Sequence, residues 1–484
     1  MPELSRNRRL LVLAICCMSL LIVGLDNTIV NIALPSIQQE LNASVSSLQW
    51  TIDAYTLVLA SLLMLSGSTA DRVGRRRTFQ TGLAVFTLGS LLCSLAPSVG
   101  WLVAFRAVQA IGGSMLNPVA LSIITNTFTE RRERARAIGV WGAAVGVSMA
   151  LGPVVGGALV GSVGWRSIFW INIPVGLAAI LLAARFVPES RAPRARRVDF
   201  VGQITMMVLL TSLTYGIIEG PRAGWESPVI IACFLIAVIA LAFLIWYEPR
   251  REDALLDTRF FRSAPFSGAT IIAVCAFASQ GGFLFMNTLY LQDVLHFSAL
   301  RAGLYTVPMA AMTIILPPIS GRIVGAVGPR IPLLIGGTGI AASALMLTRL
   351  SDTTSTAWLL GAYVLFGVGF GVVNAPITNA AVSGMPRAQA GVAAAVASTS
   401  RQVGQSLGVA VIPSVVIGGV ATLGGLVGPD FARASHAGWW IIVGCGAVLF
   451  LIGLVSTGQW ARRTAAATAA RFPSERELAE SVRT

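Results

Sequence analysis

Two aspartates and one arginine lie inside segments that are otherwise apolar, and these side chains are the strongest candidates for chemistry in the sequence. Asp26 lies in LDNTIVNIALP, Asp53 in LQWTIDAYT and Arg106 in FRAVQAIGG. A charged side chain in hydrocarbon costs about 2.5–3.5 kcal/mol on insertion scales, so each is expected to face a polar interior. With a rise of about 1.5 Å per residue, each of the three lies roughly 10–12 Å below the outer end of its helix. Because the three side chains share one depth, we predict that they form one cluster.

Such a cluster can exchange protons. A neighbouring arginine favours the charged form of an aspartate, whereas burial favours the protonated form. We interpret Asp26, Asp53 and Arg106 as the candidate proton-coupling residues, with Asp26 as the proton carrier. Two alternatives stay open: Asp26 could only hydrogen-bond to neighbouring helices, and Asp53 could be a helix-end residue in the interfacial region.

Further polar residues share the helix faces that carry these charges. Gln49 and Asp53 are four residues apart, and Arg106 and Gln109 are three apart, so each pair lies on one face. Arg401 lies inside a predicted helix and needs a counter-charge or a substrate acceptor. The substrate-binding candidates are Asn27, Asn31, Gln49, Tyr55, Gln109, Asn117, Asn374 and Arg401.

The elements that must position these residues are membrane-spanning helices. Of 484 residues only 12% are charged and 55% are hydrophobic, which excludes a chain of soluble domains. A hydrocarbon core of about 30 Å requires about 20 apolar residues in helical form. We predict an all-α polytopic membrane protein with fourteen spans, at 10–34, 46–68, 78–96, 99–124, 136–160, 165–187, 200–219, 227–247, 264–291, 300–324, 330–350, 356–383, 390–420 and 438–460.

Arginine sets the predicted orientation of these spans. The net charge is +14, the sequence contains no lysine, and most arginines fall in connections on one side of the membrane. Because cytoplasmic connections are enriched in positive charge, both termini are predicted to be cytoplasmic. The basic residues then face lipid headgroups, and no nucleic-acid partner is expected.

The first apolar run and the cysteines carry two smaller predictions. The run extends from residue 10 to 34, longer than the 7–15 residues of a cleaved signal core, so it is interpreted as a retained span. All six cysteines fall in predicted spans, and we expect reduced packing residues with no disulfide and no metal site. No cofactor is expected.

Two glycine-containing segments complete the motifs. The predicted connection 69–77 belongs to GSTADRVGRRR, which follows the second span. The fifth span reads GAAVGVSMALGPVVGGALVG, whose glycines recur four residues apart and let helices approach closely. A weaker copy of the first segment, GRIVGAVGPR at 321–330, suggests two related halves.

GSTADRVGRRR resembles the signature of the major facilitator superfamily between its second and third helices. The matching residues are Gly67, Asp71, Arg72, Gly74, Arg75, Arg76 and Arg77. LDNTIVNIALP resembles the first-helix motif of the fourteen-span drug:proton antiporters, and Arg106 matches the arginine of their fourth helix. The signature that this resemblance associates with exporters matches at Gly146, Gly152, Pro153, Gly156 and Gly157.

The resemblance implies a fold of two six-helix bundles with two additional central helices. The expected parts are the N-terminal bundle at 1–187, a two-helix insert with cytoplasmic linkers at 188–262, the C-terminal bundle at 263–460 and a cytoplasmic tail at 461–484. Several exporters of this type that transport multicationic drugs have acids in the tenth and thirteenth spans. This chain has none there, which argues against recognition of divalent cationic drugs.

The resemblance also implies a proton-driven exporter of amphipathic drugs or antibiotics in a bacterial cytoplasmic membrane, acting as a monomer and without enzymatic activity. Two alternatives stay open. The chain could export one endogenous metabolite or self-made antibiotic, or it could be a membrane-embedded sensor or enzyme, although no catalytic motif supports the last.

Overall fold

The computed structural model describes residues 5–191, 199–251, 258–382, 387–421 and 429–470. Nearly all of these residues are helical, as expected. In chain order the helices are α1 (Arg6–Leu41), α2 (Val45–Val73), α3 (Arg75–Ser94), α4 (Val99–Thr127), α5 (Arg131–Ser162), α6 (Ser167–Trp170), α7 (Asn172–Phe186), α8 (Phe200–Ala223), α9 (Pro228–Tyr247), η1 (Glu248–Arg250), η2 (Thr258–Arg262), α10 (Ala264–Leu289), η3 (Tyr290–Val294), α11 (Ala299–Tyr305), α12 (Val307–Val327), α13 (Arg330–Leu347), α14 (Thr356–Val382), α15 (Arg387–Ala421), α16 (Pro429–Val455) and α17 (Gln459–Ala469).

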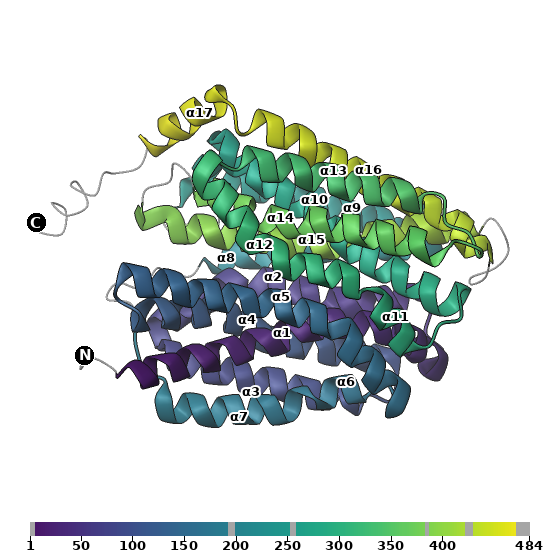
Figure 1. Cartoon of the computed structure of the whole chain (residues 1–484), viewed down its shortest axis with the longest axis horizontal. Coiled ribbons are helices and arrows are strands. Elements are labelled where there is room, and N and C mark those ends of the chain that lie inside the picture. The colour runs from purple at the N-terminus through teal and green to yellow at the C-terminus, as the bar shows by residue number, and fades with distance from the viewer. Residues whose placement is uncertain (1–4, 192–198, 252–257, 383–386, 422–428, 471–484) are drawn as a thin grey trace, which may run out of the picture.

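The helices pack as two side-by-side bundles (Figure 1). In the first bundle α1 packs on α5, α4 lies between α2 and α3, and α3 packs on α7. In the second bundle α10 packs on α15, and α13 packs on both α14 and α16. The bundles meet where α2 contacts α15 and where α5 contacts α11 and α12. The helix pair α8 and α9 joins this seam through α8, which contacts both α2 and α15.

Local sequence explains where several helices begin. Ser5 and Ser44 accept hydrogen bonds from backbone N–H groups three residues on and so cap α1 and α2. Asp199 caps α8 in the same way, with Gly202 N–H donating to Oδ1 over 2.9 Å. A side-chain acceptor at this position satisfies one of the four N–H groups that a helix start leaves without partners.

Twelve helical segments within the described residues are long and apolar enough to cross a bilayer. Fourteen spans were predicted, so two of them do not meet this criterion of length and hydropathy. The two predicted spans that do not meet it correspond to α3, whose first turn contains three arginines, and α15. Both are long helices, of 20 and 35 residues, and each packs within its bundle.

The predicted connection 69–77 is wrong. Helix α2 continues to Val73 and α3 begins at Arg75, so Gly74 alone separates them. The helix can extend through these polar residues because side chains outside the hydrocarbon need no apolar surroundings, and the chain reverses at a glycine with φ +123°. The turn between α12 and α13, in the weaker copy of this motif at 321–330, is similar. There Gly328, with φ +90°, lies between the end of α12 and Pro329.

The two ends of the molecule differ in charge. The basic end is where α1 begins and α2 ends, and it contains Arg9, Arg75 and Arg76. The opposite end is where α1 ends, near Glu40 and Arg166, which form an ion pair. Helix α17 lies at the same end as the start of α1 (Figure 1).

Candidate functional site

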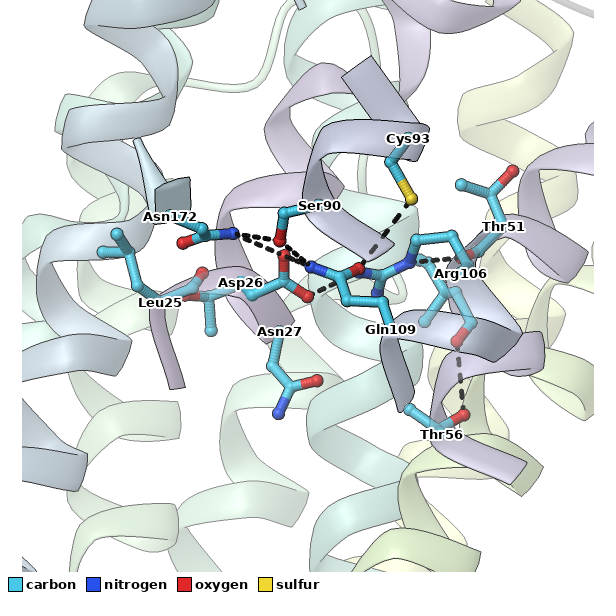
Figure 2. A network of polar contacts seen from close by, with 12 residues as sticks. Leu25, Asp26, Asn27, Thr51, Thr56, Ser90, Cys93, Arg106, Gln109 and Asn172 are labelled. Carbon is cyan, nitrogen blue, oxygen red and sulfur yellow. Dashed lines mark hydrogen bonds and ion pairs between the residues drawn. The ribbon is translucent and has the colours of Figure 1, made fainter. Parts of the chain in front are cut away.

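Asp26 and Arg106 form an ion pair inside the first bundle (Figure 2). Asp26 comes from the middle of α1 and Arg106 from the second turn of α4. Their side chains are 0% and 1% exposed, so both charges are removed from water together. A buried charge of either sign is costly alone, which makes each residue the required partner of the other.

Amide side chains complete the hydrogen bonding around the Asp26 carboxylate. Oδ2 accepts from Arg106 Nη1, and Oδ1 accepts from Gln109 Nε2 at 2.9 Å and Asn172 Nδ2 at 3.2 Å. Both amides also donate to Ser90 Oγ, at 2.8 and 3.3 Å. The carboxylate is thus held directly by residues of α4 and α7, and Ser90 of α3 contacts both amides (Figure 2).

The Arg106 guanidinium is held on its other sides as well. Nε donates to the Thr51 carbonyl at 3.1 Å, and Nη1 donates to Gln109 Oε1 at 2.7 Å. The cation lies 4.2 Å from the centroid of the Tyr55 ring, where the ring quadrupole attracts it. Asp26, Arg106, Gln109 and Tyr55 are therefore brought together as one site.

Sequence reasoning missed Ser90 and Asn172. Asn172 was visible as a lone amide within the predicted span 165–187, a signal of the same kind that singled out Asn27. Ser90 offered no comparable signal, because serines are frequent in the membrane helices of this sequence. Only its position on α3 opposite α7 gives it a role.

Asp53 does not join this network, so the expected three-charge cluster is wrong. Thr51 and Tyr55 face α4, and Asp53, two residues from each, lies about 200° around the helix. Asp53 is fully buried; its Oδ1 accepts from Thr56 Oγ1 at 3.1 Å, and its polar neighbour across the seam is Ser406 of α15.

Gln49 shares that face of α2, as its spacing predicted. Its Nε2 donates to the carbonyls of Val409 and Ala410 at 2.8 and 3.0 Å, and to Ser414 Oγ at 3.2 Å. The predicted polar stripe of α2 thus binds the second bundle, near the opposite end of the molecule. This contact ties the two bundles together.

The other candidate amides lie apart from the ion pair. Asn27 points away from the network in Figure 2, and Asn31 Nδ2 donates to its carbonyl at 3.1 Å. The side-chain oxygens of Asn27, Asn31 and Asn117 accept no hydrogen bond from any described residue. Asn374 is half-buried on α14. The oxygens of Asn27, Asn31 and Asn117 thus have free hydrogen-bonding capacity, as do Asn172 Oδ1 and the Tyr55 hydroxyl beside the ion pair.

Glu189, which sequence reasoning also missed, contacts the turn at Gly74 and the arginines that follow it. Glu189, which follows α7, accepts a hydrogen bond from Arg76 N at 3.1 Å and lies 3.9 Å from the Arg77 guanidinium. A Cβ on Gly74 would lie 2.7 Å from its Oε1. An acid at the N-terminus of α3 is favoured by the N–H groups there.

The remaining residues of the basic motif lie on α2 and at the α3 start. Asp71 accepts two hydrogen bonds from Arg75, at 2.8 and 3.2 Å. Arg72 lies in the last turn of α2, and Gly67 faces Pro118 of α4 across ordinary van der Waals distance. The motif therefore joins α2, α3 and α4 within the first bundle.

Two of the exporter-motif glycines pack on α1 beside Asp26. A Cβ on Gly156 would lie 2.6 Å from Ile29 Cγ1, and a Cβ on Gly152 would overlap Thr28. Thr28 and Ile29 follow Asp26 by two and three residues. The close packing of α5 on the carboxylate-bearing part of α1 depends on the absence of these side chains.

The next face of α5 meets the second bundle. A Cβ on Gly157 would lie 2.7 Å from Leu300 Cα, and a Cβ on Gly303 of α11 would overlap the Pro153 carbonyl. A Cβ on Gly146 would lie 3.4 Å from the Thr313 carbonyl oxygen of α12. These contacts close the seam at the opposite end, together with Gln292 Nε2, which donates to the Ile32 carbonyl at 2.9 Å.

The same stripe of α5 loses its partner toward the basic end. Gly142, four residues before Gly146, meets nothing within 4 Å, nor does Gly139. On the facing helix α12, Gly321 and Gly325 meet nothing either. The two bundles are therefore in contact at the opposite end and separate along α5 and α12 toward the basic end.

Arg401 lies in the second bundle without an acidic partner among the described residues. Its Nη2 donates to Thr378 Oγ1 of α14 at 2.6 Å, and its guanidinium is 6.0 Å from the Phe277 ring of α10. Within the described residues, no group of three or more His, Cys, Asp or Glu side chains could hold a metal ion.

A fold of two helix bundles that meet along a seam, with a buried ion pair in one of them, is the architecture of many membrane transporters. A family model described as Major Facilitator Superfamily matches residues 16–409. The chain belongs to that superfamily.

Relatives and solved structures are consistent with this assignment. The chain is 35% identical over 426 residues to "Multidrug resistance protein Stp" of Mycobacterium tuberculosis (88% of this chain and 79% of that one). It is 37% identical over 394 residues to the "Tetracenomycin C resistance and export protein" of Streptomyces glaucescens, covering 81% and 73%.

A solved bacterial homologue of the lysosomal transporter Spinster, described as inward-facing and unoccupied, has the same fold. It superposes with a TM-score of 0.65 at 19% identity and covers 96% of this chain and 99% of that one.

Proposed function

We propose that this chain is a proton-coupled antiporter that exports amphipathic drugs or antibiotics across a bacterial cytoplasmic membrane. The observation that carries the proposal is the buried Asp26–Arg106 pair, placed directly beside the α1–α5 packing. Relatives named for multidrug resistance and for antibiotic export support the substrate class.

Proton coupling requires an acid whose charge state changes the structure. When Asp26 is charged, it neutralises Arg106, and both satisfy each other's hydrogen bonds. When Asp26 takes a proton, Arg106 keeps its charge and loses its counter-ion, which favours a different arrangement of α1 against α4. The amides of Gln109 and Asn172 can still donate to the protonated carboxyl group.

A chain of contacts connects this change to the seam. Asp26 is followed on α1 by Thr28 and Ile29, which pack against Gly152 and Gly156. The adjacent face of α5 presents Pro153 and Gly157 to α11. A shift of α1 therefore acts on the helix that closes the opposite end, and this is the coupling between protonation and alternating access that we propose.

We further propose that α3 and α15 also cross the membrane, which makes fourteen spans with α8 and α9 as the additional pair. The basic end is then cytoplasmic, as its arginines favour. The structure is in this case open toward the cytoplasm. Single cysteines on a cysteine-free background test the orientation: residues 75 and 190 should be shielded from an impermeant reagent, and residues 42 and 436 should react from outside, since Ala43 between α1 and α2 is buried. External labelling at 75 contradicts the orientation.

The decisive experiment for the function is transport in proteoliposomes. Purified protein should accumulate ethidium against its gradient when the lumen is made acidic relative to the bath, and should do so only while that pH difference lasts. A protein that moves dyes down their gradients only, whatever the pH difference, is not the proposed antiporter.

A dedicated exporter of one compound is the second candidate. Relatives that are named for resistance to one antibiotic favour this candidate. An example is the "Puromycin resistance protein pur8" of Streptomyces alboniger, to which the chain is 36% identical over 408 residues. Resistance conferred on a transporter-deficient host, measured across a panel of dyes and antibiotics, separates the two. Protection against a single member supports the dedicated exporter.

A further inference from the structure

The Arg401 guanidinium is a cation whose surroundings are incomplete. Its side chain donates one hydrogen bond, from Nη2 to Thr378 Oγ1, and its buried Nε donates to no described residue. No carboxylate of the described residues lies within ion-pair distance of it. Because an arginine keeps its charge under physiological conditions, this position has an unused donor set for an anion.

The surroundings of Arg401 combine that charge with an apolar ring. Phe277 of α10 is half-buried, with its centroid 6.0 Å from the guanidinium, and packs edge-on against Phe370 of α14 at 5.1 Å. Thr378 is exposed, so the donor end of Arg401 reaches the accessible surface. A molecule with an anionic group and an aromatic body would contact the cation and the ring together.

The position of these residues favours access from the open part of the seam. Gln280, three residues after Phe277 on α10, reaches Met149 of α5 with 4.0 Å between Nε2 and Sδ, so this part of α10 is turned to the first bundle. Phe277 lies on the basic-end side of that contact, where α5 and α12 have separated.

We propose that Arg401, Thr378 and Phe277 form a subsite for the acidic group of amphipathic organic anions, and that such anions are a substrate class of this exporter. The subsite rests on the proposed export function and deepens it. The anion supplies the counter-charge that Arg401 lacks among the residues that the structure describes, and Phe277 contacts the adjoining aromatic ring.

Binding of two matched dyes tests the subsite. Anilinonaphthalene sulfonate and phenylnaphthylamine share one aromatic framework, and only the first carries a permanent negative charge. Full-length protein in nanodiscs is titrated with each, with empty nanodiscs as background. The readout is the ratio of the two dissociation constants, sulfonate over neutral dye, so that loss of folded protein cancels.

In Arg401→Gln this ratio should rise at least about tenfold, the usual effect of losing a charge-assisted hydrogen bond. Arg401→Lys, which keeps the charge, should change it far less. Arg301→Gln is the control: Arg301 also lies over a phenylalanine ring, at 3.9 Å from Phe297, but at the opposite end of the molecule, and its loss alters net charge equally. An unchanged ratio in Arg401→Gln overturns the proposal.

A measurement on the wild-type protein covers the case in which Arg401→Gln does not fold. Phenylglyoxal modifies accessible arginines, and peptide mass spectrometry reports Arg401 separately. The sulfonate should slow its modification several-fold and the neutral dye should not; equal rates contradict the subsite. Ethidium transport that persists while these tests fail would leave export intact and remove only the anion subsite.

Discussion

Arg106 and Arg401 are both arginines within membrane helices, yet their surroundings differ in kind. Arg106 in the first bundle meets a carboxylate, an amide oxygen, a backbone carbonyl and an aromatic face, and is 1% exposed. Arg401 in the second bundle meets one hydroxyl group and a distant ring, and its neighbourhood reaches the surface. A complete set of partners suits internal charge exchange, and an incomplete one suits a ligand.

The difference also separates two tasks along the molecule. The first bundle contains the buried ion pair and the glycine contacts that connect it to the seam. The second bundle contains α11, on which α5 packs, and Arg401, whose guanidinium has few hydrogen-bond partners among the described residues. Under the two proposals above, proton exchange and recognition of the anionic group reside in different bundles, which are connected through the seam.

The largest expected effect comes from removing the charge of Asp26. Asp26→Asn keeps the size and one acceptor oxygen but cannot titrate, so uphill accumulation of ethidium in proteoliposomes should fall to the level of empty liposomes, while dye binding persists. Asp53→Asn, outside the ion-pair network, should leave a measurable part of the uphill transport. If Asp26→Asn still pumps against the gradient, the proton is carried elsewhere, and Asp53 is the first residue to test.

The glycine contacts of α5 give the next largest effect. Gly156→Leu places a side chain into Ile29 of α1 and should abolish exchange or make the protein leaky to protons, with expression retained. Gly161→Leu, on the same helix at the opposite end, where the residue is exposed and nothing lies within 4 Å, is the matched control and should transport at close to the wild-type rate. Equal transport by both variants contradicts the close-packing account.

A charge-conserving substitution sharpens the comparison of the two arginines. Lysine cannot make the several directed hydrogen bonds of Arg106, so Arg106→Lys should lower gradient-driven transport by about ten- to a hundredfold. Arg401→Lys should lower ethidium transport by less than about threefold, because a cationic dye makes no ion pair there. Initial rates at matched protein amounts provide the measurement. An Arg401→Lys defect as large as that of Arg106→Lys would end the division of tasks between the bundles.

The smallest effect concerns the two related turns. Gly74 and Gly328 both have positive φ, but only Gly74 has a neighbour, Glu189, where a Cβ would lie. Each alanine variant should lose about 1–3 kcal/mol through backbone strain, and Gly74→Ala should lose more because Glu189 must move. Apparent melting temperatures in detergent test this order. A larger drop for Gly328→Ala would mean that Glu189 yields without cost.

Much of this protein follows from sequence alone. Apolar length gives the helices, buried charges identify Asp26 and Arg106, and the glycine spacing identifies α5 as a closely packed helix. These features are local, because a helix places residues three and four apart on one face whatever surrounds it. The basic motif of Gly67–Arg77 and the exporter glycines likewise indicated the superfamily to which the chain belongs.

Tertiary structure decided which of these local features meet. Spacing cannot say which helix lies opposite a face, so it could not separate Asp53, turned to α15, from Thr51 and Tyr55, turned to α4. Nor could it supply Asn172 and Glu189, whose partners are 146 and 113 residues away in the chain. Residues on one helix turn are related by the fixed geometry of the backbone, whereas contacts between helices depend on how the whole chain packs.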